Sequence, residues 1–196
     1  MARPLRNNPP CAIQHIVNRG NRRAVIFHKP GDYDAFVEVM RQACHRSGMR
    51  VIAYSVMPNH WHIVLWPPEN VSVSAFMQWL TSTHVRRYHA HYQSVGSGHI
   101  YQARYRNHVC VSERRLLAMI RYVEANPLAA KLVTRAREWK WSSLWMRLHG
   151  GEENFLTPCP IELPSNWPDY VDDTTRRKGK PTDCTSAESS VQHAEA

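Results

Sequence analysis

Two histidines separated by one residue are the sharpest chemical feature of the sequence. His60 and His62 lie in the apolar run 60–66, whose residue types favour a β-strand. Residues two apart on a strand project to the same face, so both imidazoles point one way and lie close together. Such a pair offers two nitrogen ligands to a divalent metal ion. Two histidines on a solvated sheet face would give the same pattern, and similar pairs occur in cupins and in several classes of hydrolase.

A tyrosine and an asparagine form a second chemical pair further along the chain. Tyr122 and Asn126 are four residues apart in a predicted helix, so they share one face of it. A tyrosine hydroxyl can act as a nucleophile, and an amide oxygen can bind a hard cation. Tyr122 could equally be a half-buried helical tyrosine. Asn126 could cap the helix before Pro127, because the residue before a proline disfavours helical angles.

The elements that must position these residues follow from the apolar pattern and the turn residues. Gly48 ends the first helix, for which Asp32 is a candidate N-cap, and Ser74 is a candidate cap for the second. Asn126-Pro127 is expected to interrupt the third helix, which could continue after a kink. The predicted order is strand 12–18, helix 32–47, strands 51–57 and 60–66, helix 71–92, strand 100–111 and a helix from 112.

That order resembles a ferredoxin-like split βαβ layout with an added helix. The expected fold class is therefore α+β, with one mostly antiparallel sheet and helices on one face. The length of 196 residues suits one domain, which we place at residues 1–150. Residues 151–196 are expected to form an irregular C-terminal extension that is disordered from about residue 172, because the sequence there is polar and nearly free of aromatics.

The charge distribution points to a polyanionic partner. Lys and Arg number 25 against 16 Asp and Glu, a net charge of +9 with neutral histidines. Between Val39 and Ser112 the only acid is Glu69, whereas ordinary surfaces mix both signs. Arginine dominates this stretch and aromatic residues are interleaved with it, which suits phosphates and unpaired bases. The arginines there are Arg41, Arg46, Arg50, Arg86, Arg87, Arg104 and Arg106.

Several classes of protein are disfavoured. The sequence has neither an apolar run long enough to cross a membrane nor a secretory signal at its start, so no membrane association is expected. Its five cysteines form no CxxC pair, which argues against a disulfide framework or a zinc ribbon and favours the cytoplasm. No glycine-rich phosphate loop is present, so no nucleotide cofactor is expected.

Three segments stand out together: MPNHWHIVLW (57–66), YQARYR (101–106) and RYVEANPLAA (121–130). They resemble the REP-associated tyrosine transposases, domesticated relatives of the single-tyrosine HUH transposases. The segments NRGNRRAVIF (18–27), 32–36 and WKWSSL (139–144) look similar too, so the resemblance spans roughly residues 13–148. Two departures are Tyr101, where the family has tryptophan, and Ala103, where glycine is usual.

The resemblance implies a fold of the HUH nuclease type for the 1–150 domain and a role for each matching residue. His60 and His62 correspond to the pair that holds Mg²⁺ or Mn²⁺, Tyr122 to the nucleophile and Asn126 to the third metal ligand. The family binds short palindromic hairpins, and nicks and rejoins single-stranded DNA beside them through a 5′-phosphotyrosine. Seven arginines are expected to bind the nucleic acid: Arg19, Arg22, Arg23, Arg86, Arg87, Arg104 and Arg106.

The function predicted from the sequence is therefore a metal-dependent endonuclease and strand transferase acting on hairpin-bearing single-stranded DNA in the cytoplasm. The alternative is a regulatory protein that binds hairpins in DNA or RNA on the same scaffold without cutting. A replication or mobilisation initiator on the HUH scaffold is disfavoured by the short chain. The sequence leaves open whether the protein is a monomer or a homodimer.

Overall fold

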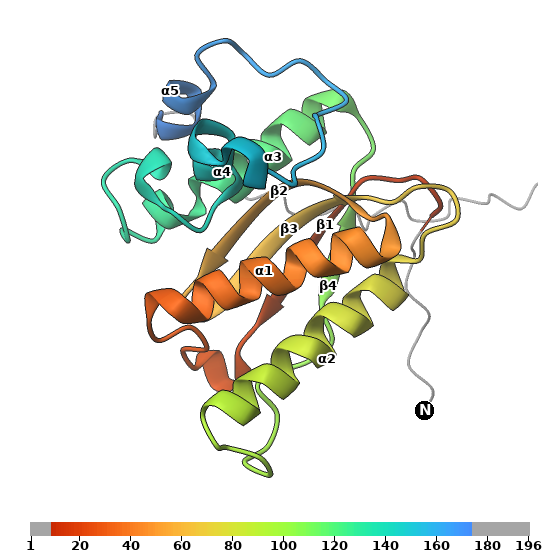
Figure 1. Cartoon of the computed structure of the whole chain (residues 1–196). Coiled ribbons are helices and arrows are strands. Elements are labelled where there is room, and N and C mark those ends of the chain that lie inside the picture. The colour runs from red at the N-terminus through yellow and green to blue at the C-terminus, as the bar shows by residue number, and fades with distance from the viewer. Residues whose placement is uncertain (1–8, 174–196) are drawn as a thin grey trace, which may run out of the picture.

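The computed structural model describes residues 9–173, and their centre is a four-stranded antiparallel sheet (Figure 1). Its strands are β1 (Gln14–Arg19), β2 (Arg50–Met57), β3 (His60–Trp66) and β4 (Arg106–Val109), in the order β2-β3-β1-β4. With a helix after β1 and another after β3, this is the ferredoxin-like split βαβ arrangement. The predicted fold class is confirmed.

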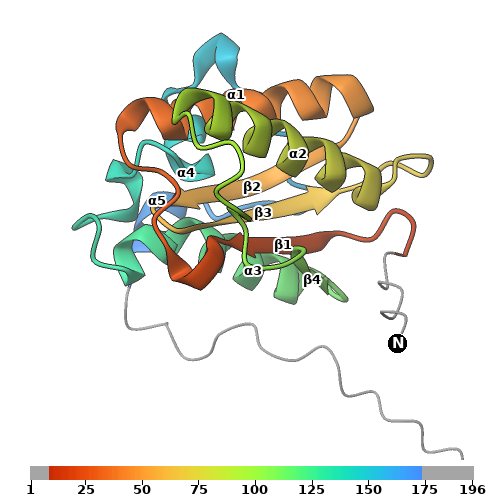
Figure 2. The ribbon, with the colours of Figure 1, turned by 90° about the horizontal axis from the view of Figure 1, so that it is seen from below.

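One face of the sheet is covered by α1 (Pro30–Ser47) and α2 (Val73–His91). The strands direct Ile16, Trp61 and Ile63 to this face. There these side chains pack against Phe36 of α1 and Leu80 of α2. All five are fully buried, so this layer forms the larger hydrophobic core. Figure 2 shows both helices on the same side of the sheet.

The third long helix lies on the opposite face, whereas the sequence analysis placed the helices on one face. Helix α3 (Glu113–Ala129) buries Leu116, Ile120 and Val123 against Ile52 and Val64 of the sheet. Both faces of the sheet can bury apolar residues because β2 and β3 are almost wholly apolar. A sheet with one solvated face would instead show alternating apolar and polar residues along these strands. A register shift between Val51 and Ala53 also turns Ile52 and Ala53 to the same side.

Two short helices flank α3. Helix α4 (Ser143–His149) and helix α5 (Trp167–Asp172) contribute Leu144, Trp167 and Val171 to the smaller core. Short 3-10 turns occupy η1 (Asn21–Arg23), η2 (Ala136–Glu138) and η3 (Gly151–Glu153). The segment expected to be irregular after residue 150 thus contains a packed helix, α5. The disorder expected further along falls mostly on residues 174–196, which lie outside the described part of the chain.

Several predicted boundaries differ from the observed ones. The strand expected over 100–111 is ordered as a strand only at Arg106–Val109, although an isolated bridge joins Tyr101 to Gly20. Ser72, not Ser74, caps α2 by accepting a hydrogen bond from the Ala75 amide. Asp32 lies in the first turn of α1, where its carboxylate accepts the Lys29 amide. Helix α3 continues through Pro127 to Ala129.

Candidate active site

The two histidines of β3 lie on the sheet face beneath α3. The register pairs His62 with Val17 and His60 with Arg19 of β1, so these four residues share one face. The imidazole centroids of His60 and His62 are 5.0 Å apart. The two rings are therefore close enough for one small ion to contact both.

The Tyr122 phenol lies against His62 of this histidine pair. Its ring centroid is 5.7 Å from that of His62, and the two rings meet edge to face. The geometry follows from α3 burying its apolar stripe on the sheet, because Tyr122 lies beside that stripe and is left half-buried. The predicted nucleophile and the predicted metal ligand His62 thus meet across the sheet–helix boundary although about sixty residues separate them in the chain.

Two further histidines extend the cluster, and sequence reasoning missed both. His15 of β1 is buried, with its ring centroid 5.1 Å from that of His62 and 5.9 Å from that of Tyr122. His108 of β4 pairs with His15 across the sheet, at 6.0 Å between centroids. The alternation of side chains along the first strand puts His15 on the same face as Val17 and Arg19. The pairing of β1 with β3, which places it beside His62, is a long-range contact that no local pattern reveals.

The turn between β2 and β3 fixes the proton position on His60. The Asn59 side-chain amide donates to the carbonyl of Arg23 at 3.2 Å, which leaves its Oδ1 facing His60 Nδ1 at 2.6 Å. An amide oxygen only accepts, so His60 Nδ1 is the donor and the Nε2 lone pair of His60 is free. Asn59 was predicted only as a turn residue, and this contact gives it a second role.

One ring nitrogen of His62 has a hydrogen-bonding partner, and the other has none within the described residues. Its Nδ1 is 2.9 Å from Nε2 of His15, a contact between buried rings. Its Nε2 is buried and has no hydrogen-bond partner within the described residues. Buried polar atoms of folded proteins nearly always have a partner, so an orphaned imidazole nitrogen indicates a place for a ligand.

Burial keeps these histidines neutral. Desolvation lowers the pKa of His60 to about 4, with a smaller contribution from the charge of Arg19. It lowers the pKa of His15 to about 3 and that of His62 well below its usual value. Protonation of any one ring would bring a charge into a poorly solvated cluster beside its neighbours. At neutral pH the rings therefore keep the lone pairs that bind metal ions.

The remaining predicted ligand stays on its own helix. The Asn126 amide nitrogen donates to the Tyr122 carbonyl at 2.8 Å, which leaves Oδ1 as an acceptor one turn beyond the phenol. Among the described residues no three His, Cys, Asp or Glu side chains could hold a metal ion together. A metal at His60 and His62 would need an oxygen ligand of another kind, and Asn126 has the right chemistry. The orphaned nitrogen of His62 and this oxygen make the residues present compatible with a divalent ion.

A buried carboxylate anchors the helix that carries Tyr122. Glu124 is fully buried and accepts hydrogen bonds from Ser143 Oγ at 2.5 Å, Trp167 Nε1 at 2.6 Å and Arg147 Nε at 3.1 Å. These donors belong to α4 and α5, so one side chain ties three helices together. Tyr122 is two residues away on the same helix, and its position depends on this junction.

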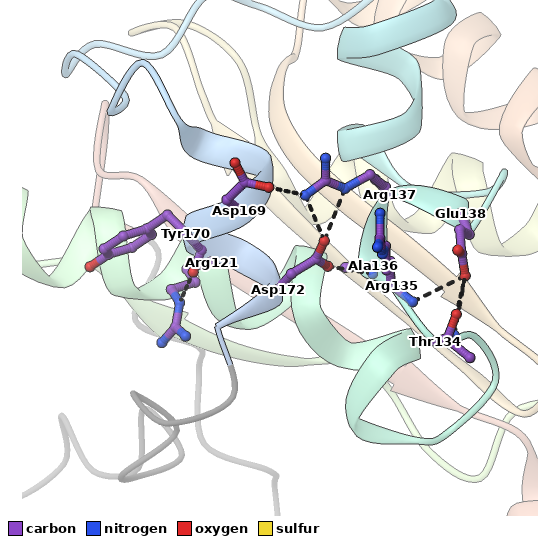
Figure 3. Close-up of polar contacts among 9 residues, drawn as sticks. All are labelled: Arg121, Thr134, Arg135, Ala136, Arg137, Glu138, Asp169, Tyr170 and Asp172. Carbon is purple, nitrogen blue, oxygen red and sulfur yellow. Dashed lines mark hydrogen bonds and ion pairs between the residues drawn. The ribbon is translucent and has the colours of Figure 1, made fainter.

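A second set of contacts ties α5 to its surroundings (Figure 3). Arg137 forms ion pairs with Asp169 and Asp172, and Asp172 also accepts the Ala136 amide at 2.6 Å. The guanidinium of Arg121, the residue before Tyr122, donates to the carbonyl of Tyr170 at 2.8 Å. Helix α5 thus packs against α3, the helix that carries Tyr122.

The seven predicted arginines occupy different parts of the surface. Arg19 and Arg106 lie on the face of the sheet that carries the histidines. Arg19 is opposite His60, and Arg106 is opposite Val17. Arg22 and Arg23 are exposed in η1, just after β1. Arg86 and Arg87 belong to α2, beyond the other face, and Arg87 donates to Gln42 of α1 at 2.9 Å. Arg104 is exposed in the loop before β4.

A groove of about 900 Å³ runs between α2 and the loop 98–105. No acidic residue lines it, and its polar side chains include Arg86, Arg104, His99 and Gln102. The groove reaches the end of β1, since the Gln102 amide donates to the carbonyl of Arg19 at 2.9 Å. The groove is therefore cationic and lies on the α2 side of the sheet, with one end next to the strand end that pairs with His60.

The packing below this loop accounts for one departure from the family pattern. Trp61 Nε1 donates to the Tyr101 hydroxyl at 3.0 Å, and that hydroxyl lies 2.7 Å from Nδ1 of His84. An indole only donates, so the Tyr101 oxygen accepts from Trp61 and the hydroxyl proton is available for His84. Tyrosine at position 101 therefore has a complete set of buried partners.

A four-stranded antiparallel sheet with a paired histidine strand and a facing tyrosine helix defines the class as the HUH transposase fold. The family model described as "Transposase IS200 like" matches residues 11–126, and the chain belongs to this family of DNA-processing enzymes. The match spans β1 to the Tyr122–Asn126 turn of α3, so it contains all four residues of the predicted site. The predicted resemblance is confirmed.

One solved structure agrees with the fold, and a second is similar over a smaller part of the chain. A REP-associated tyrosine transposase bound to a REP hairpin superposes with a TM-score of 0.63 at 16% identity, covering 83% of this chain and 95% of that one. A candidate transposase from Deinococcus radiodurans R1 gives a TM-score of 0.46 at 18% identity, with 63% and 96% covered. Proteins of curated function give no match. None of the described helices is long and apolar enough to span a membrane.

Proposed function

We propose that the protein is a divalent-metal-dependent endonuclease and strand transferase that acts on hairpin-bearing single-stranded DNA. The observation that carries this proposal is the contact of the Tyr122 phenol with His62, at 5.7 Å between ring centroids, next to the ring of His60. A protein that only bound DNA would have no need of a phenol beside two neutral imidazoles. Membership of a transposase family supplies the substrate class, and the REP hairpin bound to the structurally similar transposase supports a hairpin.

In the proposed reaction the Tyr122 oxygen attacks the scissile phosphorus. A new bond forms between that oxygen and phosphorus, and the bond from phosphorus to the 3′ oxygen breaks. The phenol loses its proton, and the departing 3′ oxygen takes one up. The products are a 5′-phosphotyrosine and a free 3′-hydroxyl. Attack by a 3′-hydroxyl on the phosphotyrosine reverses these steps and restores a phosphodiester, so rejoining requires no nucleotide cofactor.

His60, His62 and Asn126 would hold the metal ion, Mg²⁺ or Mn²⁺, through two imidazole nitrogens and one amide oxygen. When bound, the ion would polarise the scissile phosphate and neutralise charge that develops on it. None of the three ligands is negatively charged, so the full positive charge would act on the substrate. Tyr122 lies against the His62 ring, which suits attack on a phosphate held beside it.

The arginines would hold the DNA backbone around this centre. Arg19 and Arg106 lie on the face that carries the histidines, whereas Arg86 and Arg104 line the acid-free groove that ends beside Arg19. A strand in this groove would reach the catalytic face at the end of β1. Arg22, Arg23 and Arg87 stay proposed contacts to the hairpin or its flanks.

A cleavage assay separates this proposal from a hairpin-binding protein that does not cut. End-labelled hairpin oligonucleotides are incubated with the protein, with Mn²⁺, Mg²⁺ or excess chelator, and separated under denaturing conditions. We expect a metal-dependent nick and a covalent protein–DNA species. Tight hairpin binding with no nick in either metal would instead support the non-cleaving alternative.

A further inference from the structure

His15 contacts His62 through an in-plane hydrogen bond. The two nitrogens, Nε2 of His15 and Nδ1 of His62, are 2.9 Å apart. The ring planes differ by only 15° and the centroids are 5.1 Å apart, so the rings lie end to end, as a linear N–H···N bond requires. Both side chains are buried, and the contact joins adjacent strands of the sheet.

Two neutral rings share one proton in this contact, and two arrangements are possible. In the first, His62 carries its proton on Nδ1 and donates to His15, which leaves the Nε2 lone pair of His62 free. In the second, His15 donates, and His62 carries its proton on Nε2. Because Nε2 of His62 is buried without a partner, the second arrangement leaves an unsatisfied buried N–H donor.

The first arrangement also matches the neighbouring histidine. Asn59 holds His60 through Nδ1 and leaves its Nε2 free. If His15 does the same for His62, both rings present Nε2 as the ligand nitrogen. Histidines that bind metals commonly donate their other N–H to a fixed acceptor, which sets the tautomer and the ring orientation.

We propose that His15 is a positioning residue, which accepts the Nδ1 proton of His62 and so holds the Nε2 lone pair of His62 ready for a divalent metal ion. This inference rests on the proposed function and deepens it. It assigns to β1 a side chain whose role is to orient a ligand across the sheet, without contact to the substrate or to the metal.

The tautomer can be measured without metal or DNA. In protein labelled with ¹⁵N at histidine, the nitrogen shifts of the His62 ring at neutral pH distinguish a proton on Nδ1 from one on Nε2. We expect the proton on Nδ1 in the wild-type protein. A wild-type spectrum with the proton on Nε2 overturns the proposal, whatever any variant does.

Two substitutions of His15 test its role as an acceptor. A glutamine amide reaches about as far as Nε2 of histidine, whereas an asparagine amide reaches only as far as Nδ1. His15→Asn is therefore expected to weaken Mn²⁺ binding, measured by electron paramagnetic resonance, by about 10–100-fold. His15→Gln is expected to keep the affinity within a few-fold of the wild type.

His108→Asn is the matched control, because His108 neighbours His15 on the other side and has its ring 6.0 Å from it. It is expected to leave Mn²⁺ binding and the His62 tautomer unchanged. Unchanged Mn²⁺ affinity in His15→Asn would overturn the proposal. If the tautomer and the Mn²⁺ results are as expected and no DNA is cut, the proposed function fails while this inference stands.

Discussion

At the scale of single residues, the chemistry depends on neutral imidazoles beside a phenol. The spacing of His60 and His62 predicted that both lie on one face of a strand. The spacing of Tyr122 and Asn126 likewise predicted that both lie on one face of a helix. Neither spacing could show that the phenol meets the imidazoles, because that contact depends on which face of the sheet α3 covers. His15 shows the limit most clearly, since its role is visible only in the register of β1 against β3.

Removal of one histidine should weaken metal binding without loss of the DNA-binding surface. His60→Ala is expected to weaken Mn²⁺ binding by more than tenfold and to abolish cleavage, because a ligand nitrogen is lost. Hairpin affinity measured in chelator should stay within about twofold. His45→Ala, at an exposed position of α1, is the control and should behave like the wild type. Full cleavage by His60→Ala would remove His60 from the site.

At the scale of elements, the position of α3 decides the site. The sequence predicted the order of strands and helices because the strands are rich in apolar and β-branched residues and glycine or proline separates them. It did not predict α5, since a six-residue helix bounded by proline-rich loops has little periodicity, and its stability comes from burial of Trp167 and Val171. It placed α3 on the wrong face of the sheet. Helix periodicity shows which face of a helix is buried, but it does not show which surface that face packs against.

Loss of the Glu124 charge should loosen the junction that holds α3. Glu124→Gln leaves the Arg147 guanidinium without its buried counter-charge, and we expect the free energy of unfolding to fall by about 3 kcal/mol. Chemical denaturation monitored by tryptophan fluorescence measures the change. Glu152→Gln, at an exposed position, should alter stability by less than about 0.5 kcal/mol. Equal stabilities of the two variants would contradict the proposed role of Glu124.

At the scale of the whole molecule, the uneven charge of the chain becomes a surface property. The acid-poor stretch noted in the sequence contributes most of the groove beside α2, in which no acid is found. The sequence could predict a polyanionic partner, because net charge follows from composition and does not depend on the fold. It could not predict that Arg19 and Arg106 lie on the face of the sheet that carries the histidines while Arg86 lies beyond the other face.

Hairpin binding should weaken steeply with salt, because each phosphate contact releases a counterion. The double variant Arg86→Gln/Arg104→Gln is expected to lower the slope of log affinity against log salt by about 1.4, at about 0.7 per lost contact to a single strand. Fluorescence anisotropy at several salt concentrations measures it. Arg41→Gln is the control, because Glu38 already neutralises that charge in place. A slope that does not change in the double variant would exclude the groove as a DNA-binding surface.

Acid should destabilise the fold through its buried histidines. Burial lowers the pKa of His84 in the folded state to about 4, whereas an unfolded histidine titrates near 6.5. Only the unfolded state takes up this proton between these values. The stabilisation is therefore complete above pH 6.5 and is lost as pH falls towards 4, by at most about 1.4 kcal/mol per pH unit for each such group.

His84→Asn keeps an acceptor for the Tyr101 hydroxyl and removes the titrating group. Denaturation at several pH values should therefore show a smaller loss of stability between pH 6.5 and 4 in this variant than in the wild type. His45→Asn, at an exposed position, should leave the pH profile unchanged. A profile for His84→Asn as steep as that of the wild type would contradict the assignment.

The most direct test of the central claim is the identity of the residue that becomes attached to DNA. The protein is incubated with a hairpin oligonucleotide and Mn²⁺, digested with a protease and a nuclease, and analysed by mass spectrometry for a tyrosine that carries a 5′-linked nucleotide. The account predicts the modification on Tyr122, none in Tyr122→Phe, and a normal level in Tyr88→Phe, whose ring packs on the other side of the sheet. An adduct on another residue, or cleavage that persists in Tyr122→Phe, would contradict it.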